Sequence, residues 1–277
     1  MAATFLVVPL WQGSDSARAL QLVDGAEAIR GDLPASATRS VEVPTGAGDA
    51  LGSGVKRLTS VLHVRERVED ALGEIDGAAI VVGGDCGASV GAVAHAARRH
   101  GTALGVLWLD AHADLHTPDS SPSGAFGGMA LRAALGEGAD GLALAPEVAV
   151  AADRVVLGGA RDLDDAEVVA LRESGVTSIG VAGLARPDDV IDALARGGVE
   201  RLYVHVDLDV LDPAAFDGVA DAVPFGASPA DVAALLRAVL ARFPLAGASI
   251  AGFAPSSVEA AGDDLPTILR LIGALTA

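Results

Sequence analysis

Short, continuous apolar segments alternate with segments of mixed polarity along the whole chain. Seven apolar segments predict buried strands: Phe5 to Leu10, Ala78 to Val82, Ala103 to Leu109, Arg154 to Leu157, Ser178 to Val181, Leu202 to Val206 and Ala248 to Phe253. Because their apolar residues are continuous rather than alternating, these strands are expected in a sheet that is covered on both faces.

The segments between the strands have the periodicity of amphipathic helices. Helices are predicted over Ala88 to Arg99, Ala130 to Leu135, Asp165 to Glu173, Pro187 to Ala195, Pro229 to Ala241 and Pro266 to Leu275. A proline such as Pro266 is expected in a first helical turn, where its missing N–H is harmless. Strands that alternate with helices favour a parallel sheet with helices on both sides. We therefore expect an α/β fold with residues 1–277 as one domain, and Gly-, Pro- and Ser-rich loops over 31–57 and 117–128.

The composition restricts the kinds of partner. Of the 277 residues, 51% are hydrophobic, which is enough for a sizeable buried core. Thirty-seven acidic and 19 basic residues give a formal net charge of −18, so nucleic acid and anionic membrane surfaces are poor partners. Such a field attracts a metal cation or a basic small molecule, although an acidic surface also serves solubility alone.

Cysteine use and targeting signals indicate the compartment. The single cysteine, Cys86, excludes an intramolecular disulfide and a four-cysteine zinc site. The first basic residue is Arg18, so the N-terminus lacks the charged region that opens a signal peptide. The longest uncharged stretch near the C-terminus, residues 243–258, is interrupted by prolines and serines and does not predict a membrane span. We therefore expect a soluble, cytoplasmic protein.

Charged side chains directly follow three of the predicted strands. The segments are residues 81–87 (Val-Val-Gly-Gly-Asp-Cys-Gly), 107–114 (Leu-Trp-Leu-Asp-Ala-His-Ala-Asp) and 204–213 (Val-His-Val-Asp-Leu-Asp-Val-Leu-Asp-Pro). In a parallel sheet covered by helices, ligands bind just beyond the carboxyl ends of the strands. These three segments are therefore the candidate site.

The spacing within two of these segments brings carboxylates together. Asp110, His112 and Asp114 alternate along the chain and are expected to project to the same side of it. His205, Asp207 and Asp209 alternate in the same way. Four carboxylates this close cannot all stay ionised without a cation among them. Carboxylates with imidazole suit a hard or borderline divalent ion such as Mn²⁺, and four carboxylates suit two ions that share oxygens. Each aspartate alone could instead cap a turn, but the joint pattern favours metal.

The three segments resemble the signature motifs of the arginase/agmatinase (ureohydrolase) family, which are Gly-Gly-Asp-His, Asp-Ala-His-x-Asp and x-Asp-x-Asp-x-x-Asp-Pro. The resemblance covers residues 80–260 and implies a three-layer α/β/α fold around a mainly parallel sheet. It also implies hydrolysis of a guanidine or amidine carbon–nitrogen bond with two Mn²⁺ ions. It further implies a small amino-acid substrate. Because family members are commonly trimers or hexamers, it also implies a homo-oligomer.

The resemblance assigns a role to each matching residue. Asp110 and Asp207 would bridge the two ions. Asp114 would bind the first ion and accept a hydrogen bond from the bridging hydroxide, while His112 and Asp209 would complete the second site. Two cations lower the pKa of a shared water enough to supply hydroxide near neutral pH.

Cys86 departs from the family pattern, because it stands where the family has a histidine ligand to the first ion. Thiolate is a soft ligand and Mn²⁺ a hard ion, so affinity at that site should fall. The surrounding carboxylates favour a neutral thiol. The departure implies either a weakly occupied first metal site or a pocket retuned for other chemistry, unless Cys86 is only a small buried residue.

Four further positions bear on substrate binding. His116 stands where arginases have an asparagine and Ser123 matches a serine, both of which recognise the α-carboxylate of the substrate. Asp164 and Glu167 match acids that hold its α-amino group. Retention of Ser123 favours an amino acid over a decarboxylated amine. The alternatives are a solvated loop histidine at position 116 and helix-opening acids favoured by the helix dipole alone.

Two glycines replace residues that the family uses in the reaction. Gly127 stands where arginases carry a histidine that shuttles protons. His205 is a candidate substitute for this catalytic role, and a role in orienting its neighbours is the alternative. Gly252 stands where a family acid pairs with the guanidinium, so a strongly basic guanidinium would lack its counter-ion.

These departures together favour a less basic, N-hydroxylated guanidine as the substrate. We expect hydrolysis of Nω-hydroxy-L-arginine to L-ornithine and hydroxyurea by a hydroxide held between two Mn²⁺ ions. The combination of Cys86, Gly127 and Gly252 is similar to the branch of the family that carries out this reaction in antibiotic (D-cycloserine) biosynthesis. The alternatives are an arginase or another ureohydrolase and, from a different class, a catalytically silent ureohydrolase-like binding protein.

Overall fold

Continuous apolar segments form one eight-stranded sheet in the computed structural model, which describes residues 3–277. Its strands are β1 (Thr4–Val7), β2 (Thr38–Ser40), β3 (Ala79–Val82), β4 (Leu104–Leu109), β5 (Val155–Gly158), β6 (Thr177–Ile179), β7 (Arg201–Asp207) and β8 (Leu245–Ala251). Every residue of β3 and β4 is buried, as expected for strands covered on both faces. All seven predicted strands are confirmed, with shifted ends, and β2 is added at one edge.

The order of the strands positions the candidate site. The order is β2-β1-β3-β8-β7-β4-β5-β6, and every neighbouring pair is parallel. β7 and β8 therefore lie between β3 and β4, although they come near the end of the chain. The register pairs Leu109 with Val206 and Asp207 with Ala251, so the carboxyl ends of β4, β7 and β8 are nearly level. The loops that follow these strands meet at one edge of the sheet.

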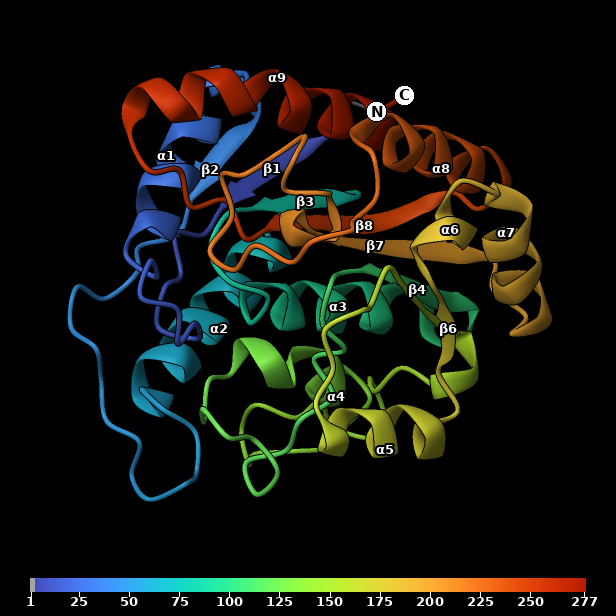
Figure 1. Ribbon diagram of the computed structural model, residues 1–277. Helices are drawn as coiled ribbons and strands as arrows, with labels where there is room; N and C mark the ends of the chain where they lie inside the picture. Colours follow the sequence, from blue (N-terminus) through green and yellow to red (C-terminus); the bar gives the residue numbers. More distant parts are fainter. Residues whose placement is uncertain (1–2) are drawn as a thin grey trace.

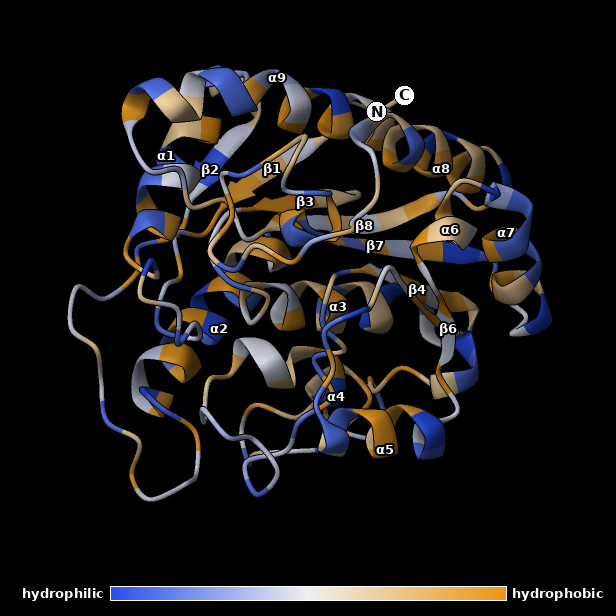
Figure 2. Cartoon of the chain, viewed as in Figure 1, coloured by the Kyte–Doolittle hydropathy of each residue, from blue (hydrophilic) through white to orange (hydrophobic). Residues whose placement is uncertain are grey.

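Helices cover both faces of the sheet (Figure 1). They are α1 (Gln21–Asp32), α2 (Leu58–Gly73), α3 (Ala88–His100), α4 (Ala130–Ala134), α5 (Asp165–Ser174), α6 (Val181–Leu184), α7 (Pro187–Arg196), α8 (Pro229–Arg242) and α9 (Val258–Leu275). One apolar cluster joins α1, α7, α8 and α9 to one face, and a second joins α2, α3 and α4 to the other. Figure 2 shows β1 and β3 as strongly hydrophobic, whereas the helices alternate between hydrophobic and hydrophilic residues. The predicted three-layer α/β/α fold is confirmed.

Three helices, α1, α2 and the four-residue α6, and one strand lie where none was predicted. α2 buries residues at helical spacing, so its pattern was present in the sequence: Leu58, Val61, Val64, Val68 and Leu72. In α1 the buried residues Leu22, Ala26 and Ile29 also follow helical spacing, with Gly25 on the same face. β2 falls inside the predicted loop of residues 31–57, where that prediction is wrong. Because β2 consists of three polar residues and is held by pairing with β1, the local sequence carries no strand pattern.

Two predicted boundaries are wrong for identifiable reasons. The last helix does not begin at Pro266. It begins at Val258, where the Ser257 hydroxyl oxygen accepts a hydrogen bond from the Ala260 N–H (3.1 Å), and Pro266 lies inside it. The serine cap, and not the proline, marks the start of this helix. The strand predicted over 248–253 corresponds to β8, which ends earlier because Gly252 adopts a left-handed conformation (φ +84°).

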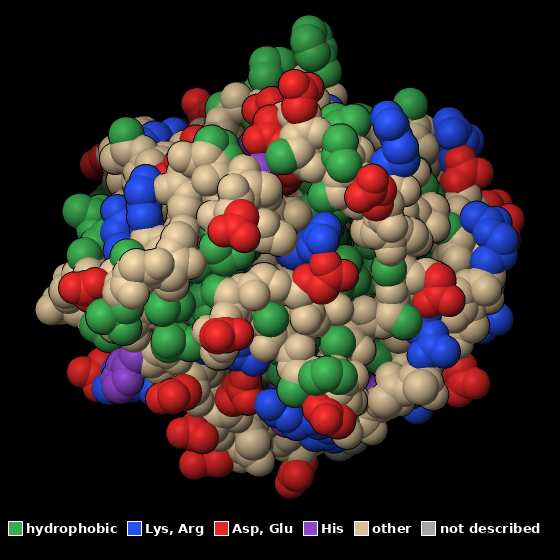
Figure 3. Space-filling view, turned by 90° about the horizontal axis from the view of Figure 1, so that it is seen from below, with side chains coloured by type: hydrophobic (Ala, Val, Ile, Leu, Met, Phe, Trp, Pro, Cys, Tyr) green, Lys and Arg blue, Asp and Glu red, His purple; other side chains and the backbone are tan. Residues whose placement is uncertain are grey.

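Acidic and basic side chains share the face of the molecule that Figure 3 shows. Figure 3 shows acidic and basic side chains interspersed on one face of the molecule rather than gathered into a single patch. Within residues 3–277, no helix is both long enough and apolar enough to span a membrane. The single-domain organisation and the homo-oligomer stay predictions.

Candidate active site

A cavity of about 180 Å³ opens at the carboxyl edge of the sheet. Eight of the eleven predicted site residues line it: Cys86, His112, Asp114, His116, Ser123, Glu167, Asp207 and Asp209. The other three, Asp110, Asp164 and His205, each lie next to a lining residue. The topology therefore brings together all the segments in which chemistry was predicted.

A first group of potential metal ligands, the His112 cluster, consists of Asp110, His112 and Asp209. His112 Nδ1 lies 3.0 Å from Asp209 Oδ2 and 3.4 Å from Asp110 Oδ1. Backbone amides hold the two acids, because Ala111 N–H donates to Asp209 Oδ1 (2.9 Å) and His112 N–H donates to Asp110 Oδ1 (2.7 Å). Side chains thus tie the loop after β4 to the loop after β7.

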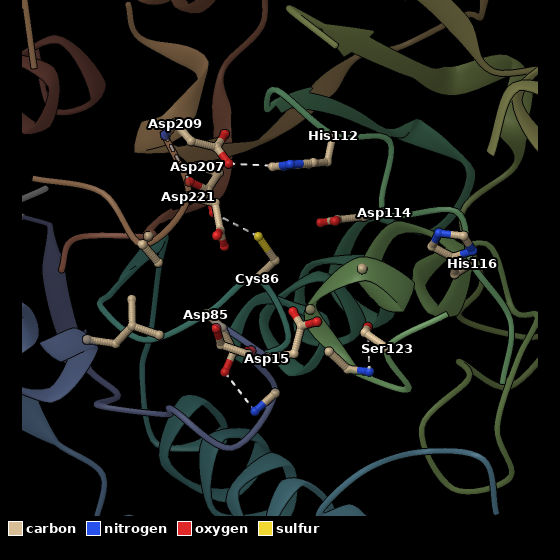
Figure 4. Close-up of a pocket in the computed structure, with 18 of the residues that line it drawn as sticks. Asp15, Asp85, Cys86, His112, Asp114, His116, Ser123, Asp207, Asp209 and Asp221 are labelled. Atoms are coloured by element: carbon tan, nitrogen blue, oxygen red, sulfur yellow. Dashed lines mark hydrogen bonds and ion pairs between the residues drawn. The ribbon is translucent and has the colours of Figure 1, made fainter. Parts of the chain in front are cut away.

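A second group, the Cys86 cluster, consists of Cys86, Asp110, His205 and Asp207, whose potential ligand atoms all lie within 4.8 Å of one another. The Cys86 thiol donates to Asp207 Oδ2, with the sulfur 2.9 Å from that oxygen and 3.7 Å from Asp110 Oδ2. Figure 4 shows Cys86 facing Asp207 and His112 facing Asp209. The two clusters share Asp110, so ions held by them would be neighbours.

Asp114 presents a carboxylate oxygen without a partner. Its side chain is 3% exposed, and its Oδ2 accepts no hydrogen bond within the described part of the chain. Its backbone is left-handed (φ +53°), which is uncommon for a residue other than glycine and indicates a conformation held by its surroundings. Burial and the neighbouring charge of Asp110 raise the pKa of Asp114 well above its ordinary value. A bound cation would satisfy such an oxygen.

Protons reduce the negative charge of this set of side chains. Burial raises the pKa of Asp207 to about 7 and that of Asp209 to about 6, and adjacent carboxylates add to both effects. Burial also raises the pKa of the Cys86 thiol well above its ordinary value. For His112, burial alone would lower the pKa, but the hydrogen bonds to Asp110 and Asp209 raise it well above its ordinary value.

The donor set fits two divalent cations. Carboxylates and one imidazole form the His112 cluster, which suits a hard or borderline ion, and the thiol makes the Cys86 cluster softer. Two buried polar atoms have no partner among the described residues and are available to a cation: His205 Nε2 within the Cys86 cluster and Asp114 Oδ2 outside both clusters. The individual ligand assignments and the identity of the metal stay predictions.

The residues predicted to bind substrate form a separate group. His116 Nε2 lies 3.3 Å from Asp164 Oδ2 and 3.9 Å from Glu167 Oε2. Ser123 lines the cavity and accepts a hydrogen bond from Ala125 N–H (3.1 Å). In Figure 4, His116 and Ser123 lie across the cavity from Asp207. Of the four residues, only Asp164 is not part of the cavity wall. It caps α5 by accepting a hydrogen bond from Glu167 N–H (2.9 Å), which is the alternative role that the sequence left open.

Gly127 and Gly252 both line the cavity. At Gly252, φ is +84° and a Cβ would lie 2.2 Å from Asp207 Oδ1. A side chain there would be strained by the backbone and would collide with a predicted metal ligand. The backbone conformation and the nearby Asp207 therefore favour glycine over an acidic residue at position 252.

Three acids of the cavity wall were not predicted as site residues: Asp15, Asp85 and Asp221. Asp85 is buried and accepts hydrogen bonds from Gly13 N–H and Gly87 N–H, both 2.9 Å. Burial raises its pKa to about 7. Its place in the Gly-Gly-Asp segment could have identified it. Asp15 and Asp221 are exposed loop residues with no local pattern, so only the topology reveals them.

His205 is fully buried and does not line the cavity. Its Nδ1 lies 2.9 Å from Ser89 Oγ and 2.8 Å from Ser249 Oγ. Its ring stacks on Trp108, with the ring centroids 3.8 Å apart. Burial lowers the pKa of His205 to about 3, so the imidazole is neutral. The structure therefore orients this ring firmly but gives it no contact with the cavity.

Comparison with known proteins agrees with this fold. The profile of the arginase family matches residues 20–264. An N(omega)-hydroxy-L-arginine amidinohydrolase of Streptomyces lavendulae is 33% identical over 217 residues, which is 77% of this chain and 74% of that protein. An arginase of Bacillus caldovelox is 31% identical over 194 residues, 64% of each chain.

Solved structures show the same fold. Entamoeba histolytica arginase in complex with L-ornithine superimposes with a TM-score of 0.86 at 22% identity, covering 99% of this chain and 97% of that one. The proclavaminate amidino hydrolase of Streptomyces clavuligerus gives a TM-score of 0.75 at 21% identity, covering 99% and 90%. With its profile match, its curated relatives and its fold, this chain belongs to the arginase family of hydrolases.

Proposed function

We propose that this protein hydrolyses Nω-hydroxy-L-arginine to L-ornithine and hydroxyurea at a centre of two Mn²⁺ ions. The observation that carries the choice of substrate is Gly252, because the backbone there excludes the acid that would pair with a strongly basic guanidinium. An N-hydroxyguanidine is less basic and needs that counter-ion less. The 33% identity to the amidinohydrolase of Streptomyces lavendulae supports the same substrate.

The residues of the two clusters would hold the cations. Asp110 and Asp207 would bridge them, His112 and Asp209 would complete one site, and Asp114 with the Cys86 cluster would complete the other. Two bound cations would keep these carboxylates ionised and lower the pKa of a shared water. The cavity of about 180 Å³ beside these residues would receive the substrate.

The side chains around the cavity would orient the reactants. The unpartnered Asp114 Oδ2 would accept a hydrogen bond from the attacking water and direct it toward the planar guanidine carbon. Ser123 and His116 would bind the α-carboxylate of the substrate, and Glu167 would bind its α-amino group. The water oxygen would add to the guanidine carbon, and the bond from that carbon to the ornithine nitrogen would break. One proton of the water would pass to the departing ornithine nitrogen and the other to the imine nitrogen that stays in hydroxyurea, so water and substrate together account for both products. His205 does not line the cavity, so a proton-shuttle role would need a route that the cavity does not offer.

The test is a product assay with the purified full chain and Mn²⁺. Hydroxyarginine and arginine are supplied at equal enzyme concentration, and hydroxyurea, urea and ornithine are measured. We expect hydroxyurea and ornithine from hydroxyarginine at the higher rate. Faster turnover of arginine would assign the protein as an arginase, and binding of either compound without turnover would assign it as a silent binding protein. A part in antibiotic biosynthesis stays a prediction.

A further inference from the structure

The ligand environment of Cys86 contains an imidazole that the family motif does not include. Cys86 occupies the position of a histidine in that motif, yet a nitrogen of His205 lies within 4.8 Å of the Cys86 sulfur. His205 belongs to β7 and lies two residues before Asp207, so the two side chains project to the same face of the strand. An imidazole is therefore present at the Cys86 cluster, but it comes from another strand.

The surroundings of His205 orient one nitrogen and leave the other free. Hydroxyls from two different elements, Ser89 of α3 and Ser249 of β8, lie within hydrogen-bond distance of Nδ1. A protonated Nδ1 can donate to two such oxygens, which leaves the lone pair on Nε2. His205 Nε2 is buried and has no hydrogen-bond partner in the described residues. Metal-binding histidines typically have this arrangement, in which the second nitrogen is fixed by a hydrogen bond.

Trp108 links this imidazole to the shared carboxylate. Its ring stacks on that of His205, and its Nε1–H donates to Asp110 Oδ2 (3.2 Å). Asp110 belongs to both clusters, so the same side chain fixes the histidine and a predicted bridging ligand.

We propose that His205 Nε2 binds the cation of the Cys86 cluster and thereby supplies the imidazole that position 86 lacks. This inference rests on the proposed two-cation centre. A site with one thiol, one imidazole and two carboxylates is softer than the His112 cluster, so it should select Zn²⁺ or Co²⁺ over Mn²⁺ more strongly than its neighbour does. His205 is then a ligand rather than a proton shuttle.

The experiment observes the imidazole directly. The full chain, treated with EDTA and labelled with ¹⁵N in its six histidines, is titrated with Zn²⁺ and followed by two-bond ¹H–¹⁵N spectra. We expect the Nε2 signal of His205 to shift as Zn²⁺ binds while its Nδ1 stays protonated. Two bound ions with a shift of His112 but none of His205 would overturn this inference and leave the proposed function standing. A chain that binds no divalent ion would overturn the proposed function itself.

Variants provide an independent readout. His205→Gln should lose one of two Zn²⁺ ions by calorimetry, and retention of both with unchanged affinity would contradict the proposal. If that variant does not fold, Ser249→Ala removes only one partner of Nδ1. It should weaken one of the two ions roughly tenfold and leave the other unchanged. His63→Asn, at an exposed histidine of α2, is the matched control and should bind both ions as the unmodified chain does.

Discussion

The His112 cluster and the Cys86 cluster share Asp110 but balance their negative charge in different ways. In the His112 cluster an imidazole lies between two carboxylates, at 3.0 and 3.4 Å, and their hydrogen bonds raise its pKa. In the Cys86 cluster the imidazole of His205 carries no charge, because burial lowers its pKa to about 3, and burial instead keeps protons on the thiol and on Asp207. One cluster is compensated by an ion pair and the other by protonation.

The difference between the two clusters indicates which of the two cation sites can change its metal affinity. Either cluster must release protons before it binds a cation, but the His112 cluster releases them from nitrogen and the Cys86 cluster from sulfur and oxygen. The His112 cluster follows the family motif, whereas the Cys86 cluster departs from it. We therefore expect the departure to alter the affinity and selectivity of the cation site at the Cys86 cluster and to leave cation binding at the His112 cluster unchanged.

The largest effect is expected when the residue common to both clusters is changed. Asp110→Asn removes a carboxylate charge that both cations would share, so both should bind more weakly. The loss of several kcal/mol of charge stabilisation should lower turnover by roughly a thousandfold. Turnover and metal content are measured on the same preparation. Asp165→Asn, at an exposed acid of α5, is the control and should be unaffected. Full activity of Asp110→Asn would rule out the proposed centre.

A substitution confined to the His112 cluster should affect one cation. His112→Asn removes the imidazole of that cluster, so one of the two ions should bind roughly a hundredfold more weakly. Calorimetry with Mn²⁺ would separate the two binding events. Equal weakening of both would mean that the clusters are not distinct sites.

Some residues of the two clusters could be predicted from the sequence, whereas others depend on the fold. Asp110, His112, Asp207 and Asp209 could be predicted because each follows a strongly apolar strand at a spacing of two. Their convergence also followed from the rule that ligands bind at the carboxyl ends of parallel strands.

Other features could not be found in the local sequence. The hydroxyls around His205 come from α3 and β8, and only the placement of β7 beside β8 and the packing of α3 brings them together. Asp221 joins the cavity wall from an exposed loop without periodicity. Asp164 is a different case, because its local sequence fits two roles. An acid that caps a helix and an acid that binds an amino group have the same local pattern.

The two modes of charge compensation predict how stability depends on pH after metal is removed with EDTA. The folded pKa values of Asp207 (about 7) and Asp209 (about 6) exceed the ordinary value of 3.8, so the folded state holds extra protons between about pH 4 and pH 7. Stability should therefore fall as pH rises through this window. The raised pKa of His112 adds a further fall that begins above its ordinary value of 6.5.

Melting temperatures from pH 4 to pH 8 would test this dependence. Asp207→Asn should flatten the lower window relative to the unmodified chain, and His112→Asn should flatten only the upper one. Saturating Mn²⁺ should remove the fall, because it binds the deprotonated side chains. The prediction is contradicted if the melting temperature of the metal-free chain rises steadily from pH 4 to pH 7 and Asp207→Asn does not alter this rise. Asp207 and Asp209 would then hold no extra protons in the folded state.

The smallest effect is expected from restoring the family residue at the departing cluster. Cys86→His replaces a soft ligand with an imidazole, so the Mn²⁺ affinity of that cluster should rise by roughly tenfold while the His112 cluster is unchanged. The gain should be larger in a His205→Gln background, where the cluster has no other imidazole. Cys86→Ser separates loss of the thiol from gain of a nitrogen ligand and should show no such rise. Equal Mn²⁺ stoichiometry and affinity in Cys86→His and the unmodified chain would mean that Cys86 does not limit the site, and that the two clusters differ in charge compensation alone.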